Sequence, residues 1–515
     1  MAEQINPFSI TAPGYMGLNT QDAPVDMNQQ FALEANNCVI DKFGRVGARK
    51  GWSPVHTTNT DLGSNPLEAI GEYVAPSGTR TIICAGNGFI FKLTGSTLTT
   101  LTYGGGGSAP VISANNWQMA SMNGALTLFQ EGYDPLIYDP ALSTTQFRRC
   151  SEHPSYSGTI IQGHCGISAY GRLWTARTPT DKNLIKWCDL LIHYKWNAGS
   201  AGSLDLTGVW PHGGDEIVAL ATHNNSLFIF GTKQILIYTG ANDPATMELS
   251  DSIGNTGCVG RDTVQNTGAD IFFLSDSGLR SVMRTIQEKS APLRNISRNV
   301  NNDVLDYLNN EVGGATVKSA YSPIDSFYLL TFVVSGVTYC FDTRTMLEDG
   351  SSRATFWPNV KHRAYHYSKD RILYVGQVGY LAKYDSYYDN GESYRMTYYS
   401  SWIDFGNPVM TSILKKIVMT LFGTINQTVV YKWGFDYISS QAAQPTVITD
   451  ATVPAGYNIA EYGIAEYARN LLVKSLGVQA SGSGKVIQIG FEAQLLGYPI
   501  SIQRVDIFTK DGALK

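Results

Sequence analysis

The sequence predicts an all-β protein: a six- or seven-bladed β-propeller followed by a C-terminal β-sandwich, with one short helical insertion. Three observations lead to this prediction: short apolar strands come in groups, the groups repeat along the chain, and the repeat ends near residue 393. The composition agrees with it. Only 16% of the 515 residues are charged, against about 25% in typical domains, while Gly (51) and Tyr (29) are abundant. Such a chain has many turns and enough apolar residues for a large core.

The stretch GDEIVALATHNNSLFIFGTKQILIYTG at 214–240 shows one group of strands. It is read as strands at 216–221, 226–230 and 235–239 that are joined by polar turns. An antiparallel sheet with one solvated face alternates apolar and polar residues, but the second and third strands are apolar at nearly every position. Both faces of this sheet are therefore expected to be covered, as in a blade packed between two other blades.

Similar groups recur along the chain. Their middle strands begin near Thr81, Ala125, Arg172, Ser226, Asp270, Ser326 and Arg371. This spacing is close to the period of about 40–50 residues that, with four strands per unit, indicates a β-propeller. Seven units are counted, and six blades are possible because one unit could be an insertion on the rim. A series of β-sandwiches is the competing prediction, and it would give cleaner alternation in every strand.

These patterns divide the chain into three parts. Residues 1–55 are expected to form an N-terminal arm and a hairpin that closes onto the propeller, residues 56–392 the propeller, and residues 393–515 the sandwich. The helical insertion is expected at about 296–310, where the apolar residues of ISRNVNNDVLDYLNN recur at helical spacing. The segment 463–477 could be a short helix or a strand with a turn.

Charge and cysteine usage narrow the possible functions. The net charge is −5 and basic residues are not clustered, so no basic face for tight duplex binding is expected. The seven cysteines are far apart and several lie in apolar strands, which favours buried, reduced thiols. The N-terminus has no apolar segment typical of a signal peptide, and no apolar run approaches about 18 residues. We therefore expect no membrane insertion by the protein itself.

The motifs do not predict an enzyme. GSGK at 482–485 lacks the residues of a phosphate-binding loop, and GGGG at 104–107 is read as a flexible loop. His362 and His366 are four residues apart in a strand, where such residues lie about 13 Å apart, too far for a shared metal ion. SDSG at 275–278 does not have the spacing of an aspartate box. The sequence thus predicts no catalytic, cofactor-binding or metal-binding residue, although paired carboxylates from distant positions could not be found by spacing.

The most distinctive stretch is PGYMGLNTQDAPVDMNQQFALEANNCVIDKFGRVGARKGWSPV, residues 13–55. It resembles the opening of the tail nozzle proteins of short-tailed bacteriophages, also called tail tubular protein B, in which a GLN start leads to NCVID and then GRVGARKGW. Residues 214–282 resemble the related tail hub, or packaged-DNA stabilisation, family, in the order of a blade, a GxxG connection and a second blade. The resemblance covers most of the chain in layout, and its sharpest motifs are confined to these two ranges.

The resemblance implies a structural virion protein of the phage tail that is assembled in the host cytoplasm and has no catalytic residues or cofactors. Such proteins form a homohexameric ring below the portal and adaptor rings. The ring extends the DNA conduit, retains the packaged genome and opens for ejection. Further implied partners are tail fibre or needle proteins and double-stranded DNA, which passes through the lumen without sequence-specific contacts.

Two long connections, 101–116 and 190–214, are then expected to face the lumen or a neighbouring ring, because loops of this length are usually functional or mobile. Two other functions remain open. One is a propeller-type carbohydrate-binding or depolymerase tail protein. The other is a propeller that binds a receptor or docks a fibre without catalysis.

Overall fold

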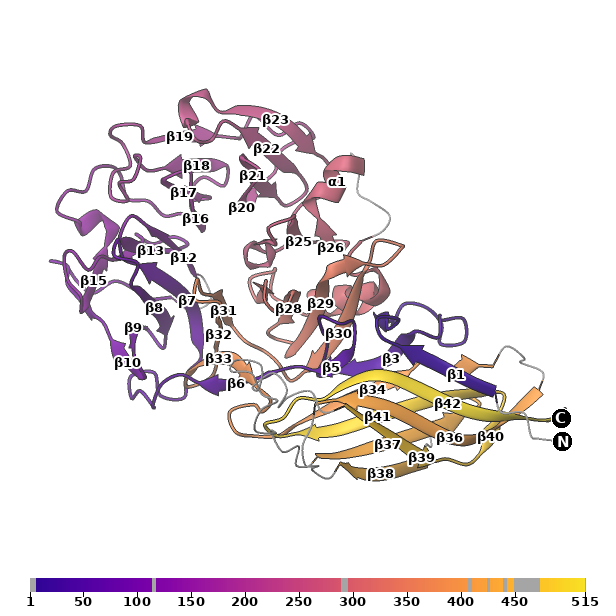
Figure 1. The fold of residues 1–515 in the computed structure, drawn as a ribbon. Coiled ribbons are helices and arrows are strands. Elements are labelled where there is room, and N and C mark those ends of the chain that lie inside the picture. The colour runs from indigo at the N-terminus through magenta and orange to yellow at the C-terminus, as the bar shows by residue number, and fades with distance from the viewer. Residues whose placement is uncertain are drawn as a thin grey trace, which may run out of the picture.

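The computed structural model describes residues 6–113, 117–288, 295–405, 410–423, 427–438, 442–448 and 473–514. It confirms the predicted fold class: a β-propeller is joined to two further large sheets, with a short helix on its rim (Figure 1). The first and last strands that the structure describes, β1 (Asn6–Thr11) and β42 (Ser501–Leu514), lie side by side in one of these sheets (Figure 1). Among the described residues, none of the helices is long and apolar enough to span a bilayer.

The first three blades are consecutive antiparallel meanders. Blade 1 contains β7 (Leu67–Val74), β8 (Arg80–Gly86), β9 (Phe89–Thr94) and β10 (Thr97–Thr100). Blade 2 contains β12 (Trp117–Met122), β13 (Ala125–Gln130), β14 (Leu136–Tyr138) and β15 (Gln146–Arg149), with β11 (Thr102–Tyr103) parallel to β15. Blade 3 contains β16 (Cys165–Ala169), β17 (Arg172–Ala176), β18 (Leu184–Trp187) and β19 (Gly202–Asp205).

The remaining units follow the same plan, and one of them is shorter. Blade 4 contains β20 (Ile217–His223), β21 (Ser226–Gly231), β22 (Ile235–Thr239) and β23 (Glu248–Ile253). A three-stranded sheet follows, with β24 (Gln265–Asn266), β25 (Ile271–Ser275) and β26 (Gly278–Ser281). Blade 5 contains β27 (Val317–Ser322), β28 (Phe327–Phe332), β29 (Val337–Met346) and β30 (Ser352–Pro358). Blade 6 contains β31 (Ala364–Tyr367), β32 (Leu373–Gly376), β33 (Leu381–Ser386) and β6 (Gly51–Pro54).

The described part of the propeller thus has six blades of four strands, of which blade 2 also includes β11, and one three-stranded sheet, and together these make up the seven units counted in the sequence. The inner strands contact one another in the order β7, β12, β16, β20, β24, β27, β31 and back to β7, which closes the ring. The seven middle strands begin within two residues of their predicted starts. Sequence alone could place these strands because each unit is a local meander.

Strand β21 shows why both faces of a blade are apolar. Leu227 and Ile229 pack in a core cluster with Trp174 of blade 3. Phe228 and Phe230 point the other way, into a cluster with Phe273 of the three-stranded sheet. Alternate side chains of one strand therefore enter two different interfaces, as the unbroken apolar pattern predicts.

The two sheets beyond the propeller combine both ends of the chain. One contains β39 (Val473–Gln479), β36 (Met410–Phe422), β42 (Ser501–Leu514), β5 (Val46–Ala48) and β4 (Cys38–Ile40), with β1 (Asn6–Thr11) and β40 (Ser483–Gly484) paired at its sides. The other contains β3 (Phe31–Asn36), β34 (Tyr394–Ser400), β41 (Val486–Leu495), β37 (Gln427–Phe435) and β38 (Ala442–Ile448), with β2 (Gly17–Leu18) and β35 (Ile403–Asp404). Strand β3 also pairs with β30 of blade 5 at Asn36 and Phe356, so this sheet continues into the propeller.

The N-terminal hairpin, β4 and β5, contacts both regions: β4 lies against β29 and β30 of blade 5, and β5 pairs with β42 of the C-terminal part. Strand β6, which follows it, completes blade 6. One expectation for the chain layout needs correction. The connection at 190–214 is not one long loop, since it contains β19, the outer strand of blade 3.

The helical insertion is α2 (Asn301–Asn309), which follows a 3₁₀ turn at Arg298–Val300. Val300 of the turn and Val304 of the helix are buried and pack in the core cluster shared with the sandwich. A second helix, α1 (Val282–Glu288), follows β26, and single 3₁₀ turns occupy Cys150–Glu152, Pro244–Thr246 and Arg261–Thr263. Of the ambiguous segment 463–477, residues 473–477 belong to strand β39, and the rest lies outside the described residues. All seven cysteines are buried free thiols, as expected.

Candidate functional site

A polar cavity of about 350 Å³ lies on the propeller axis, where inner strands converge. Residues of β7, β12, β27 and β31 line it, together with the 3₁₀ turn at Arg261–Thr263. This volume is typical of a small-molecule pocket, which ranges over about 300–1,000 Å³. The cavity cannot admit duplex DNA, because a single groove of the duplex is already about 12 Å wide.

Arg261 reaches across the axis to the opposite blades. Its guanidinium donates hydrogen bonds to the carbonyl oxygens of Trp117 in blade 2 and His164 beside blade 3. It also pairs with Asp262, at 2.8 Å from Nε to Oδ1, and Lys318 of blade 5 pairs with the other oxygen of that carboxylate. Burial alone would raise the pKa of Asp262, but the two cations hold this pKa well below its usual range. The carboxylate thus stays charged and ties blade 5 to the axial network.

Two glutamates of β7 are buried here: Glu68 lines the axial cavity, and Glu72 lines a second pocket, which shares His366 with it. Glu68 Oε1 accepts a hydrogen bond from Arg363 at 2.9 Å, whereas Oε2 is buried with no hydrogen-bond partner. Burial raises the pKa of Glu68, and Arg363 opposes this shift. For Glu72, burial acts in the same direction, but contacts with His366 and the Lys369 backbone N–H leave the pKa lowered. The cavity can therefore hold a small polar ligand between fixed charges.

Arg49 lies at the junction between the propeller and the sandwich. It is 1% exposed, and its guanidinium forms a bidentate pair with Asp389, at 2.9 and 2.6 Å. The ring of Tyr394 lies 4.1 Å from the guanidinium carbon and that of Trp52 lies 4.6 Å from it. A Cβ at Gly51 would lie 2.0 Å from the Tyr388 carbonyl oxygen, so no other residue fits there without a shift. The stretch ARKGW thus fixes the strand that enters blade 6.

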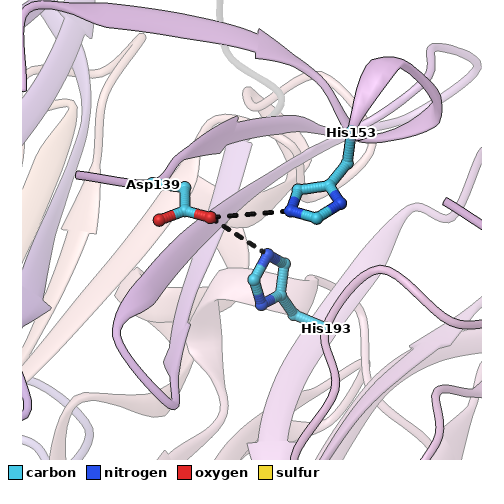
Figure 2. A group of neighbouring side chains, drawn as sticks. All are labelled: Asp139, His153 and His193. Atoms are coloured by element: carbon cyan, nitrogen blue, oxygen red, sulfur yellow. Dashed lines mark ion pairs between the residues drawn. The ribbon is translucent and has the colours of Figure 1, made fainter. Parts of the chain in front are cut away.

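Asp139, His153 and His193 meet between blades 2 and 3 (Figure 2). Asp139 follows β14, His153 follows the 3₁₀ turn at Cys150–Glu152, and His193 lies in the loop after β18. The Asp139 Oδ2 atom is 3.7 Å from Nε2 of His153 and 3.9 Å from Nε2 of His193. All three residues are at most 9% exposed.

The electrostatics of this cluster favour neutral imidazole rings. Burial lowers the pKa of His193 to about 4, although Asp139 acts in the opposite direction. Burial also lowers the pKa of His153, whose ring stacks on Tyr194 at 3.9 Å between centroids. Two neutral imidazoles and one carboxylate form a donor set that can hold a metal ion.

The motifs that the sequence analysis considered and rejected lie outside the Asp139 cluster. His362 packs edge-on against Trp52 and accepts a hydrogen bond from the Gln377 amide, whereas His366 lies beside Glu72. Residues 482–485 contain the short strand β40, which pairs with β36, and the Lys485 N–H after it donates to Asp436. Residues 275–278 form the hairpin between β25 and β26.

Sequence reasoning missed the Asp139 cluster altogether. Its three members lie far apart in the sequence and do not have the short, regular spacing of zinc-ligand motifs. They could be grouped only once blades 2 and 3 were known to be neighbours.

The chain matches no protein-family model and no curated protein. Similar solved structures include the WD40 domain of Neurospora crassa Pan2, with 10% identity over 65% of this chain and 96% of that chain and a TM-score of 0.36. The WD40 β-propeller domain of Doa1 is 12% identical over 65% and 96%, with a TM-score of 0.37. The extracellular domain of a hybrid two component system from B. thetaiotaomicron is 13% identical over 66% of this chain, which spans 42% of that chain, with a TM-score of 0.37. These likenesses concern the fold alone.

Proposed function

We propose that this chain is a structural, non-enzymatic virion protein: the subunit of the tail nozzle or hub ring of a short-tailed bacteriophage. In this role, copies of the chain surround the DNA conduit below the portal and adaptor, retain the packaged genome and open for ejection. The observation that carries the proposal is the position of the stretch that resembles nozzle proteins. Residues 13–55 contribute strands to both sandwich sheets and the last strand of blade 6.

A ring subunit has to keep its shape while its neighbours press on it, because ring closure depends on a fixed angle between copies. The buried Arg49–Asp389 pair and the continuous sheet from β30 through β3 to β34 tie the propeller to the sandwich. These links favour one rigid wedge over two loosely tethered domains. The low charge and the many tyrosines of the chain suit large contacts between subunits.

The axis of the propeller is not a path for DNA. Arg261 of the 3₁₀ turn donates to the Trp117 carbonyl of β12 there, and Asp262 of the same turn pairs with Arg261 and with Lys318 of β27. A conduit therefore has to be formed between copies rather than through a single propeller, which is the arrangement that a ring provides.

Light scattering during size-exclusion chromatography, followed by negative-stain imaging, tests this proposal on the purified chain. The expected result is a closed ring of six copies with a central opening wide enough for duplex DNA, and the same protein in purified virions. A chain that stays monomeric at high concentration and is absent from virions would contradict the proposal.

A carbohydrate-binding or depolymerase protein is the second candidate, and the axial cavity favours it. The unpartnered Oε2 of Glu68 and its raised pKa are compatible with a general acid in that cavity. The measurement is release of reducing ends from host polysaccharide by the purified chain. Cleavage that is lost in Glu68→Gln would support this candidate over the ring, and no cleavage by the unmodified chain would remove the hydrolase.

A further inference from the structure

The seam between blades 2 and 3 contains the one group of three potential metal ligands found among the described residues. We propose that Asp139, His153 and His193 bind a zinc-class transition-metal ion that links the two blades. The ligands come from both sides of the seam, since Asp139 and His153 belong to blade 2 and His193 to the loop after β18 of blade 3. This inference does not depend on the proposed ring function.

The chemistry of the three side chains selects the class of ion. Imidazole nitrogen suits zinc, cobalt, nickel and copper, whereas magnesium and calcium prefer sites made of oxygen. Two histidines and one carboxylate are also a known zinc donor set, in which a fourth position is left to water or another ligand.

The distances are close to those of a formed site. Zinc bonds of about 2.0–2.2 Å place the donor atoms of a tetrahedral ion roughly 3.3 Å apart. Here the carboxylate oxygen is 3.7 and 3.9 Å from the two nitrogens, and all three donors lie within 4.8 Å of one another. Binding therefore requires the donors to close in by about half an ångström or more. Both histidines lie in turns rather than in strands, so their side chains can make this movement without breaking a sheet.

The second observation that points to a ligand is the missing hydrogen-bond partner of the buried His193 side chain. Its side chain is more than nine-tenths buried, and its Nε2 atom has no hydrogen-bond partner although it faces the carboxylate. Most buried polar atoms have a partner. A metal ion at this point would supply one, and it would use the lone pair of a neutral ring.

Neighbouring backbone groups orient the Asp139 carboxylate, and one hydrogen bond of His153 has to be given up when a metal ion binds. Asp139 Oδ1 accepts a hydrogen bond from the Ala141 backbone N–H at 2.9 Å, which leaves Oδ2 for the histidines. His153 Nδ1 accepts from the Ser155 N–H at 3.1 Å, so the neutral ring carries its proton on Nε2. Metal binding moves this proton to Nδ1 and releases the Ser155 N–H, which water can take over because Ser155 is exposed.

The experiment uses the full-length chain, purified without a histidine tag, stripped with a chelator and then dialysed. Titration with Co²⁺ is expected to give a visible absorption band that saturates at one ion per chain and disappears when Zn²⁺ displaces the cobalt. Thermal denaturation should show a higher melting temperature with Zn²⁺ than with the chelator, because an ion that binds only the folded state stabilises that state.

Two variants test the ligands, and a third is the matched control. Asp139→Asn and His193→Gln are each expected to lower the affinity for Co²⁺ by about ten-fold or more, the loss that follows even changes in the groups that support metal ligands. His366→Gln removes the histidine of the Glu72 pair, which has no third ligand nearby among the residues that the structure describes, and should leave the affinity unchanged.

The proposal is overturned by binding that is weak and exceeds one ion per chain, by the absence of a cobalt band, or by an unchanged affinity in Asp139→Asn. Asp139→Asn keeps the size of the side chain, so this variant tests the proposal even where His193→Gln does not fold. Folding of each variant is checked by circular dichroism in the presence of the chelator.

Discussion

The propeller and the sandwich are both β-structures, but they are built from the chain in opposite ways. Blades 1 to 5 are runs of strands that are adjacent in sequence, such as β20 to β23, and blade 6 takes only its outer strand, β6, from another part of the chain. The sandwich joins strands from the two ends of the chain, and β1 pairs with β42 between Asn6 and Thr509. The propeller is therefore a sum of local units, whereas the sandwich exists only when the ends of the chain have met.

The N-terminal segment connects these two modes of construction. Strands β3, β4 and β5 complete the sandwich sheets, and β6 follows at once to complete blade 6. The closure of the propeller thus depends on the same short segment, from β3 to β6, that holds the sandwich together. We expect the two regions to unfold together for this reason. Two predictions test that expectation, and two more test the packing between blades and the burial of His362.

The largest effects are expected from two substitutions that each create a cavity, one in the propeller and one in the sandwich. Phe230 in blade 4 and Phe491 in β41 are both fully buried, and replacing either with alanine should cost about 3–5 kcal/mol of unfolding free energy. Differential scanning calorimetry should show each variant shifting one shared transition to lower temperature. A variant that moves only one of two separate transitions would mean that the regions are energetically independent.

Arg49→Ala should have the next largest effect, about 3 kcal/mol, because it leaves the Asp389 carboxylate without its buried partner. Unlike the phenylalanine variants, it should also split the transition in two by loosening the junction. Arg80→Ala is the control: Arg80 pairs with Asp370 where the side chains are 32% and 60% exposed, so a loss below about 1 kcal/mol is expected in urea unfolding. Equal losses in both variants would argue against a special role for the junction.

Contacts between blades should be sensitive to a single methyl group. A Cβ at Gly166 of β16 would lie 2.1 Å from the ring of the buried Phe129 in blade 2, so Gly166→Ala should cost about 1–3 kcal/mol. The control Gly106→Ala adds the same methyl group where nothing lies within 4 Å. Urea midpoints measure both variants, and a Gly166→Ala protein as stable as the control would show that the blades can move apart freely.

The smallest effect concerns pH. Burial lowers the pKa of His362 to about 3, and Arg49 acts in the same direction. Because the folded-state pKa lies below the unfolded value of about 6.5, the stabilisation is complete above pH 6.5 and is lost as the pH falls toward 3. His362→Gln cannot take up a proton, so at pH 5.5 the unmodified protein should lose about 1.4 kcal/mol more than the variant, relative to pH 8. Parallel stability profiles in urea would contradict this.

The blades were predictable to within a few residues because their strands pair with neighbours in sequence. The pattern at 226–239 required two covered faces, and the structure supplies them from blade 3 and the three-stranded sheet. The place of the N-terminal hairpin was not predictable, since β5 pairs with β42 from the opposite end of the chain. A short apolar hairpin fits either sheet equally well, and nothing in its own residues selects one of them.

The functional residues also divide into features that local sequence predicts and contacts that only the folded chain creates. The sequence by itself determined the strand lengths, the repeat and the apolar faces, because these follow from local backbone geometry and burial. Only the tertiary structure decided that Arg49 meets Asp389, that Arg261 spans the axis, and that Asp139, His153 and His193 share one seam. Such contacts depend on which units become neighbours in space, and that choice is made by ring closure and by the meeting of the chain ends.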